Sequence, residues 1–199
     1  PYLAGRHYEA LGEIMDQCYL AAAQMGNEDP TYANSFRWNR LVLCALANEF
    51  DEGHELLDEW IDDKLELQRR QYRLWKVIYY LLAGQDDQAM TYATAWQTET
   101  PQFREPYVAI VFLMSRDKDY DGLLVQVDRW ETICRDAIAT DPRSETRWEG
   151  ILTFCSYTRL DVLTSTGQFD DLVAIVETLR AQDPDDMAYF LTYITALTE

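Results

Sequence analysis

A short turn of one form recurs along this chain and constrains the fold more than any other feature. Four copies start at Asn48, Gly84, Lys118 and Gly167; each contains Asp, and a small or apolar residue stands five positions after each start. Nine positions after the starts stand Leu57, Ala93, Val127 and Val176, and twelve after stand Trp60, Trp96, Trp130 and Leu179. A degenerate fifth copy spans residues 5–10, and successive starts are about 43, 36, 34 and 49 residues apart. Such self-similarity is typical of helical repeats.

The segments between these turns have helical periodicity. In the first of them, Leu11, Ile14, Met15 and Cys18 follow the spacing of one helix face. Helices are also expected around 43–50 and 56–61, and at about 66–83, 86–99, 104–116, 120–139, 143–165, 169–181 and 186–198. With only 8 Gly and 6 Pro in 199 residues, a hairpin-rich β fold is disfavoured. The prediction is an all-α chain of about ten helices with no strand.

The recurring turn, followed in two units by a proline seventeen positions after its start (Pro101 and Pro184), resembles the tetratricopeptide repeat. The resemblance implies an α-α superhelix of antiparallel helical hairpins in one domain over residues 1–199. A partial repeat at 1–30 would precede repeats at about 31–65, 66–101, 102–142 and 143–184, and a capping helix at 185–199 would end the chain. The first-helix Trp-Leu-Gly-Tyr signature of that family is not reproduced, and Trp60, Trp96 and Trp130 stand where the family usually has Ala. A more general helical-hairpin solenoid therefore stays open.

Both ends fit this frame. Residues 7–26 are interpreted as the second helix of a unit that lacks its first helix. Residues 186–198, with Phe190, Leu191, Ile194 and Leu197, are interpreted as a lone first helix that caps the array. The unpaired helix at the start offers a contact for a second copy, so a homo-oligomer is possible on this reading.

Composition excludes several classes of partner. The chain has 17 Lys and Arg against 35 Asp and Glu, a formal charge of −18, which argues against nucleic acid and anionic membrane as partners. No apolar stretch approaches 18 residues, so no membrane span is expected. Cys18, Cys44, Cys134 and Cys155 form no CxxC pair and are expected to be buried free thiols. These features predict a cytoplasmic protein.

The basic residues concentrate on the first helix of each predicted hairpin. Arg37 and Arg40 recur 36 residues later as Arg73 and Lys76, and Arg159 holds the register of Arg40. In tetratricopeptide-like solenoids the first helices line the concave face, so the resemblance implies a basic groove for a ligand with carboxylates. The alternative is that these bases pair with acidic residues of neighbouring helices. Aromatic residues on first helices, namely Trp38, Trp75, Tyr79, Tyr80, Tyr107 and Trp148, either line the groove or pack between helices.

The leading hypothesis is a non-enzymatic module that binds a protein or peptide on this concave face, as a scaffold or the sensor part of a larger regulator. The proposed contact set is Arg37, Trp38, Arg40, Arg73, Trp75, Lys76, Tyr80, Arg104, Tyr107, Arg147 and Arg159. The alternative is an acidic inhibitor of the immunity-protein type, which masks a basic partner such as a nuclease. An all-α enzyme is a third class, and no residue constellation supports it.

No cofactor is expected, and two motifs only approach a metal site. Asp117, Asp119 and Asp121, followed by Gly122 and Asp128, match part of an EF-hand loop, but Asp128 stands where that loop has Glu. The same residues fit the recurring turn. His54 to Asp58 is a near-match to a zinc-protease helix that lacks the second His.

Overall fold

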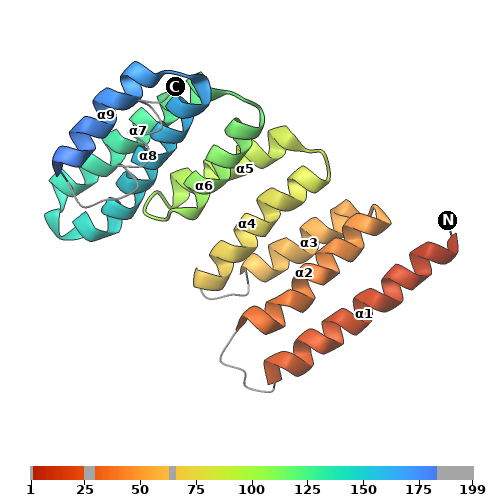
Figure 1. Ribbon diagram of the computed structural model, residues 1–199. Coiled ribbons are helices and arrows are strands. Elements are labelled where there is room, and N and C mark those ends of the chain that lie inside the picture. Colours follow the sequence, from red (N-terminus) through yellow and green to blue (C-terminus); the bar gives the residue numbers. More distant parts are fainter. Residues whose placement is uncertain (1, 25–29, 63–65, 183–199) are drawn as a thin grey trace. The chain divides into compact units, whose positions relative to one another are not determined.

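The computed structural model describes residues 2–24, 30–62 and 66–182 (Figure 1). Within these ranges the chain forms nine α-helices and no strand, and helices that are adjacent in sequence pack in pairs. The α-helices are α1 (Tyr2–Gln24), α2 (Pro30–Ala47), α3 (Phe50–Asp62), α4 (Glu66–Leu82), α5 (Asp86–Glu99), α6 (Glu105–Arg116), α7 (Tyr120–Thr140), α8 (Glu145–Thr166) and α9 (Phe169–Gln182). This confirms the all-α prediction. The predicted capping helix at 185–199 lies outside the described residues.

The four predicted turns share one backbone geometry. Their first residues all adopt positive φ: Asn48 at 64°, Gly84 at 69°, Lys118 at 58° and Gly167 at 69°. In each turn this residue donates its N–H to the carbonyl three positions back, and the next residue donates to the carbonyl five positions before itself, at 2.8–3.3 Å. This is the Schellman motif, which satisfies the free carbonyls at a helix C-terminus. The turns therefore link α2 to α3, α4 to α5, α6 to α7 and α8 to α9 as four helical hairpins.

The second helix of each hairpin buries the positions that the sequence singled out. Five residues after the turn start, Ala89, Leu123 and Leu172 are fully buried, and Gly53 is buried too. The residues nine positions after the start are also fully buried: Leu57, Ala93, Val127 and Val176. The tryptophans twelve positions after it, Trp60, Trp96 and Trp130, are at most 5% exposed. The second helices thus turn one apolar stripe inward, as their periodicity predicts.

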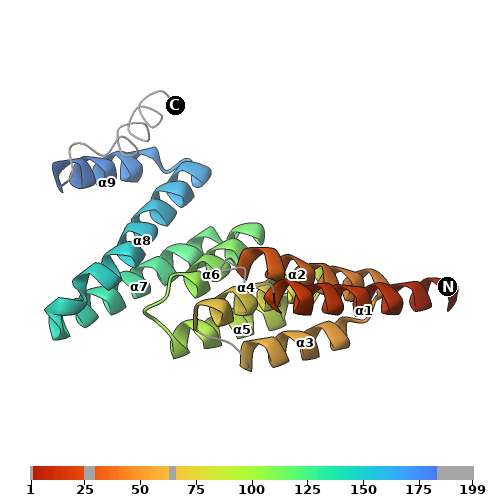
Figure 2. The ribbon, with the colours of Figure 1, turned by 90° about the horizontal axis from the view of Figure 1, so that it is seen from below.

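The chain divides into two compact units, residues 1–93 and 94–199, and the boundary in the sequence falls within α5. In the first unit, α1 packs on α2, α2 on α3, and α3 on α4 (Figures 1 and 2). A core joins the last three of these helices and consists of Leu41, Cys44, Leu57, Trp60, Ile61, Tyr72 and Tyr79. In the second unit, α6 packs on α7, α7 on α8, and α8 on α9. The core of the last hairpin consists of Leu160, Leu163, Leu172 and Val176.

Three local features differ from the sequence-based expectation. The helix expected around residues 43–50 ends at Ala47, because Asn48 has positive φ and begins the turn to α3. The turn expected at residues 5–10 is absent, because α1 runs without interruption from Tyr2. Gly5 is tolerated there, since the residues around it are sufficient helix formers to outweigh one glycine. The helix expected from residue 143 begins at Glu145, after a 3-10 turn over Pro142–Ser144. Asp141 causes the delay, because its carboxylate accepts a hydrogen bond of 3.2 Å from the amide of Arg143 and caps this turn.

None of the helices in the described part of the chain has the length and apolar character that crossing a lipid bilayer requires.

Candidate functional site

The recurring bases of the first helices form ion pairs between consecutive hairpins. Lys76 of α4 pairs with Asp58 of α3, and Arg159 of α8 pairs with Asp128 of α7 at 2.7 Å. In both pairs the base stands eight residues before its own turn residue, and the acid stands ten residues after the preceding one. Arg40 of α2 holds the same position, and its Nε lies 3.8 Å from a carboxylate oxygen of Asp16 in α1. The bases that recur in the sequence therefore occupy one structural role.

These pairs turn the base inward and the acid outward. The side chains of Lys76, Arg40 and Arg159 are 7%, 12% and 19% exposed, whereas those of their aspartate partners are 52–68% exposed. Arg40 also pairs with Glu52, and Arg159 donates a hydrogen bond of 3.1 Å to Glu131. These three bases thus pair with acidic residues of neighbouring helices, which is the alternative that the sequence left open. A role in partner binding stays a prediction for them.

Arg37 is buried among aromatic rings. Its guanidinium carbon lies 4.0 Å from the ring centroid of Tyr19 and 4.7 Å from that of Trp60. Its Nη1 donates a hydrogen bond of 3.0 Å to the hydroxyl of Tyr72, which in turn donates one of 2.6 Å to Asn34. Arg37 therefore joins α1, α3 and α4 around α2, a structural position with little access for a ligand.

The predicted aromatic contacts divide between half-buried and buried positions. Trp38 of α2 and Trp75 of α4 are half-buried, and their ring centroids lie 5.3 Å apart. Tyr80 is half-buried as well, with the ammonium of Lys76 5.9 Å from its ring centroid. Tyr107 is fully buried and donates a hydrogen bond of 2.7 Å to the carbonyl of Pro101. The structure thus brings Trp38 and Trp75 together between α2 and α4, whereas Tyr80 packs against His54 of α3 and Tyr92 of α5. Tyr107 packs in the interior of the second unit.

The remaining predicted contact residues are scattered. Arg73 of α4 is half-buried. Arg104, before α6, is exposed, and its guanidinium carbon lies 5.0 Å from the ring centroid of Phe154. Arg147 of α8 is exposed. These three arginines thus differ in exposure, and the binding role of the predicted set stays a prediction.

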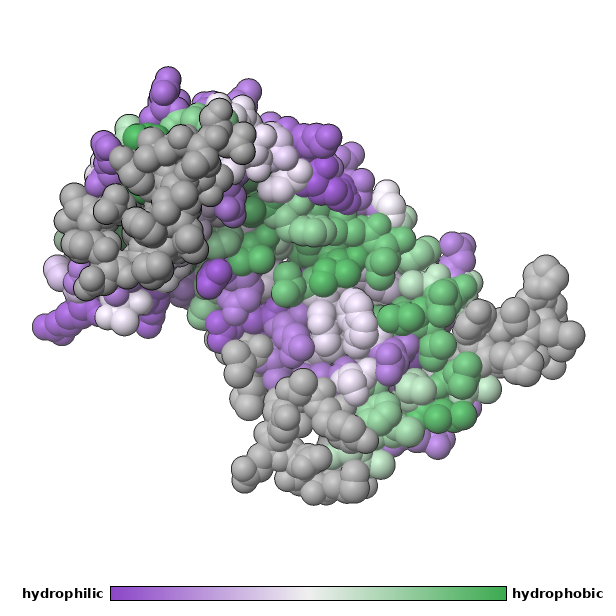
Figure 3. Space-filling model, in the orientation of Figure 1, coloured by the Kyte–Doolittle hydropathy of each residue, from purple (hydrophilic) through white to green (hydrophobic). Residues whose placement is uncertain are grey.

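Sequence reasoning missed an apolar stripe on the outer face of the first helices. Two, six and ten residues before the turn residues of α2 and α4 stand six apolar side chains, here called the first-helix stripe: Trp38, Val42, Leu46, Leu74, Ile78 and Leu82. Leu46 and Leu82 are 64% and 52% exposed, and the other four are half-buried. Figure 3 shows apolar side chains at the surface over the parts of α2 and α4 that lead into their turns. The available signal was the four-residue spacing repeated 36 residues later.

In the second unit, α6 repeats two of these positions, with Val108 and Phe112 at 38% and 56% exposure.

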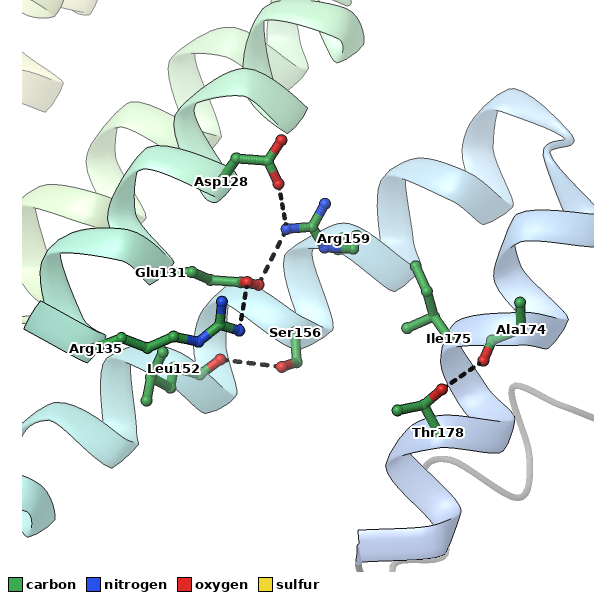
Figure 4. Close-up of a pocket in the computed structure, with 9 residues that line it drawn as sticks. All are labelled: Asp128, Glu131, Arg135, Leu152, Ser156, Arg159, Ala174, Ile175 and Thr178. Carbon is green, nitrogen blue, oxygen red and sulfur yellow. Dashed lines mark hydrogen bonds and ion pairs between the residues drawn. The ribbon is translucent and has the colours of Figure 1, made fainter.

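A cavity of about 720 Å³ lies between α7, α8 and α9 in the second unit (Figure 4). Its polar wall is a chain of ion pairs in which Glu131 accepts hydrogen bonds from both Arg135 and Arg159. Asp128 accepts a further bond from Arg159. Leu152, Ala174 and Ile175 provide apolar lining. Two arginines and two carboxylates compensate each other, so this wall carries no excess charge for an ionic ligand.

The residues of the EF-hand-like segment have other contacts. The side chain of Asp119 caps α7 by accepting a hydrogen bond of 3.1 Å from the amide of Gly122, and Asp128 belongs to the Arg159 pair. Asp117 pairs with Arg116, and Asp121 lies exposed in the first turn of α7. Across the described ranges, His, Cys, Asp and Glu side chains form no group of three or more that could hold a metal ion.

The half-buried His54 and three buried cysteines have shifted pKa values. Burial lowers the pKa of His54, whose Nε2 lies 3.2 Å from Oε1 of Gln85. Burial also raises the pKa of the Cys44 and Cys134 thiols to about 11 and that of Cys155 to about 12. All three cysteines are free thiols with almost no thiolate at neutral pH, so they are poor nucleophiles.

Comparison of this chain with protein-family models, with curated proteins and with solved structures finds no match.

Proposed function

We propose that this chain is a non-enzymatic, tetratricopeptide-like helical-hairpin module that binds another protein or peptide along the outer face of its first helices. The observation that carries this proposal is the first-helix stripe. Six apolar side chains occupy matching positions on α2 and α4, and two of them are more than half exposed. A contiguous apolar surface on a highly charged protein is characteristic of an interaction site.

Two members of the stripe, Leu46 and Leu82, are supported as a binding surface because they are exposed outside the core, although Trp38 packs against it. Leu57, Tyr72 and Tyr79 already fill the inside of this unit, whereas Leu46 and Leu82 contribute little to it. Covering an exposed leucine with a partner's side chain removes its remaining apolar area from water, which stabilises a complex by about 1–2 kcal/mol per residue. Two adjacent helices, each with apolar residues at a spacing of four, would accept an apolar segment laid across or between them.

This proposal changes the ligand chemistry expected from the sequence. Arg40 and Lys76 already have carboxylate partners within the fold, so a ligand carboxylate would have to displace an aspartate or glutamate to reach them. The ligand favoured by the stripe is therefore recognised through apolar side chains, with Trp38 of the stripe as the large anchor and Trp75 in contact with it.

Selection of binders from a random peptide library tests the proposal. The immobilised chain is panned against the library, and the recovered peptides are titrated against the wild type and against Leu46→Gln/Leu82→Gln. The double variant should bind at least about tenfold more weakly, which corresponds to the loss of roughly 1.4 kcal/mol. The matched control is Leu20→Gln, at a position on α1 that is 57% exposed and outside the stripe, and it should bind as the wild type does. Equal binding by the double variant and the wild type would refute the proposal.

A second candidate, the acidic inhibitor, is favoured by the orientation of the ion pairs. Asp16, Asp58 and Asp128 are exposed, whereas the side chains of their basic partners are at most 19% exposed, so the outward charge is more negative than the composition alone implies. Such a surface would attract a basic protein by long-range electrostatics. Titration against a panel of basic nucleases tests it: a steep loss of affinity with added salt supports masking, and an absence of binding at low salt rejects it.

A further inference from the structure

A small cavity of about 130 Å³ lies between α6, α7 and α8 in the second unit. Leu123, Thr158 and Val162 are the buried residues of its lining. Asp161 and Ser165 also line it and are exposed. The cavity therefore has a largely apolar inner end and a polar opening to solvent. Its volume equals that of about four water molecules, so it can hold a small organic group.

The three helices around this cavity repeat an arrangement of the first unit. α2, α3 and α4 form a hairpin followed by the first helix of the next hairpin, and so do α6, α7 and α8. An ion pair joins the last two helices of each set, between Asp58 and Lys76 in the first unit. The corresponding pair in the second unit is formed by Asp128 and Arg159. The two sets can therefore be compared position by position, by counting from their turn residues.

In the first unit, the positions that correspond to the cavity residues are packed with apolar side chains. Tyr79 is a fully buried core residue, and Phe50 and Trp75 pack against the core. In the second unit, side chains with oxygen atoms occupy many of these positions. Ser115, Tyr120, Thr158, Asp161 and Ser165 correspond, in this order, to Ala45, Phe50, Trp75, Ile78 and Leu82. Polar groups thus surround an open space where the first unit has apolar packing.

The loss of side-chain volume explains why there is a cavity at this place. Val162 stands at the position of Tyr79, and Thr158 stands at the position of Trp75, so two aromatic rings are missing. Leu123 stands at the position of Gly53 and makes up only part of this difference.

Asp161 has a carboxylate that the fold leaves available. Asp58 and Asp128 pair with bases, whereas Asp161 has no hydrogen bond or ion pair among the residues that the structure describes. Partial burial raises the pKa of Asp161, and no base of the described chain counteracts this shift. A cation bound beside the carboxylate would favour its charged form.

Hydroxyl groups complete the polar part of the lining. Ser115 and Tyr120 are half-buried, and Ser165 is exposed. The hydroxyl of Thr158 donates a hydrogen bond of 2.9 Å to the carbonyl of Phe154, which leaves its oxygen able to accept one. A primary ammonium has three donors and no acceptor, so one carboxylate and neighbouring hydroxyl oxygens match its bonding requirements.

We propose that this cavity binds a short-chain alkylammonium ion, with the ammonium group at Asp161 and the alkyl group against Leu123 and Val162. The order of polar and apolar lining favours a free amine over the lysine side chain of a partner protein. A lysine would enter with its ammonium first and would bring the charge to the apolar inner end, where burial of a charge is costly.

NMR titration of the full-length chain with n-propylamine hydrochloride tests this proposal. The backbone amides of the residues that line the cavity should shift and saturate at millimolar concentrations of the amine. Asp161→Asn keeps the shape of the side chain and removes its charge, so the affinity should fall at least about tenfold. Asp136→Asn is the matched control, because it removes the same charge at an exposed position of α7 outside the cavity. It should bind the amine as the wild type does.

A second variant tests the cavity separately from the charge. Ser165→Leu places at the opening the side chain that Leu82 provides in α4, while it keeps Asp161. It should also weaken binding at least about tenfold, because the alkyl group can no longer enter. Two further titrations of the wild type control for the chemistry of the ligand. n-Propanol, which lacks the charge, and potassium chloride, which lacks the alkyl group, should leave the cavity amides unshifted.

Several results would overturn the proposal. These are the absence of shifts at the cavity with n-propylamine, equal affinity in Asp161→Asn and the wild type, and equal binding of n-propanol. N-acetyl-lysine methylamide should bind more weakly than n-propylamine; if it binds as tightly, the cavity accepts a lysine side chain and the free amine is the wrong ligand. Loss of peptide binding in the Leu46→Gln/Leu82→Gln variant concerns the first unit and would not affect this cavity.

Discussion

Arg159 of α8 donates a hydrogen bond of 2.7 Å to Asp128 of α7, and thereby links the second helix of one hairpin to the first helix of the next. The pair between Lys76 and Asp58 has the same position in its own hairpins. In both, the acid is exposed to water, which screens the interaction, so each pair contributes on the order of 1 kcal/mol or less. Their recurrence indicates a role in fixing the register between consecutive hairpins more than in adding stability.

Arg37 and Lys76 should differ sharply in their effect on stability. Lys76→Met keeps the apolar stem and leaves Asp58 solvated, so it should lower the free energy of unfolding by less than about 1 kcal/mol. Arg37→Met should cost about 2–4 kcal/mol, because it removes a buried guanidinium and leaves the hydroxyl of Tyr72 without its donor. Urea unfolding of both variants measures the contrast, and equal losses would show that Arg37 does not hold α1, α3 and α4 together.

The sequence predicted the turns, the inward stripe and most helix boundaries, because these follow from local periodicity and from residues that tolerate positive φ. Lys118 was placed at a turn start by its register, and it does adopt positive φ. The role of the recurring bases was harder to predict from the sequence. Asp16, Asp58 and Asp128 also recur, but only a register between different helices connects each of them with its base. The exposure of Leu46 and Leu82 was inaccessible as well, since an apolar residue at helical spacing usually faces the core.

Gly53 should tolerate no side chain while Tyr79 is present. A Cβ built at Gly53 overlaps the phenol ring of Tyr79, so Gly53→Ala should cost about 1–3 kcal/mol despite the higher helix propensity of Ala. The matched control is Gly150→Ala in α8, where a Cβ meets nothing within 4 Å; it should stabilise the chain by about 0.5–1 kcal/mol.

Tyr79→Leu completes this double-mutant cycle, because it removes the ring that a Cβ would meet. In that background the cost of Gly53→Ala should fall below about 1 kcal/mol. If Gly53→Ala is as destabilising in the Tyr79→Leu background as in the wild type, the steric overlap does not involve Tyr79.

Replacing Lys118 by glycine should stabilise the folded chain. Its φ of 58° lies in the left-handed region, which costs a residue with a Cβ about 1 kcal/mol relative to glycine. Lys118→Gly should therefore raise the midpoint of thermal unfolding, whereas Gly84→Ala, at 69° in the equivalent turn, should lower it by a similar free energy. Shifts of the same sign in the two variants would contradict a shared turn geometry.

His54 should make stability fall as the solution is acidified. Burial lowers its pKa in the folded chain below the value of about 6.5 that applies to the unfolded chain. Between these two values the unfolded chain binds more protons, so the contribution of His54 is present above about pH 6.5 and is lost as the pH falls toward the folded pKa. His54→Phe has no titratable group at this position. Comparison with the wild type therefore separates the contribution of His54 to the pH dependence of stability from that of the many carboxylates.

The measurement is urea unfolding of the wild type and His54→Phe at several pH values between about 5 and 8. The wild type should lose stability relative to the variant on acidification. If the free energies of unfolding of the two chains change with pH in parallel, His54 has the same pKa in the folded and the unfolded chain.

The first-helix stripe is tested most directly by the change in peptide affinity when its exposed leucines are replaced. Calorimetric titration of a library-selected peptide compares the wild type, Leu46→Gln/Leu82→Gln and the control Leu20→Gln, with urea unfolding to confirm that all three chains are equally stable. The double variant alone should lose at least about tenfold in affinity. Unchanged affinity in the double variant would contradict it.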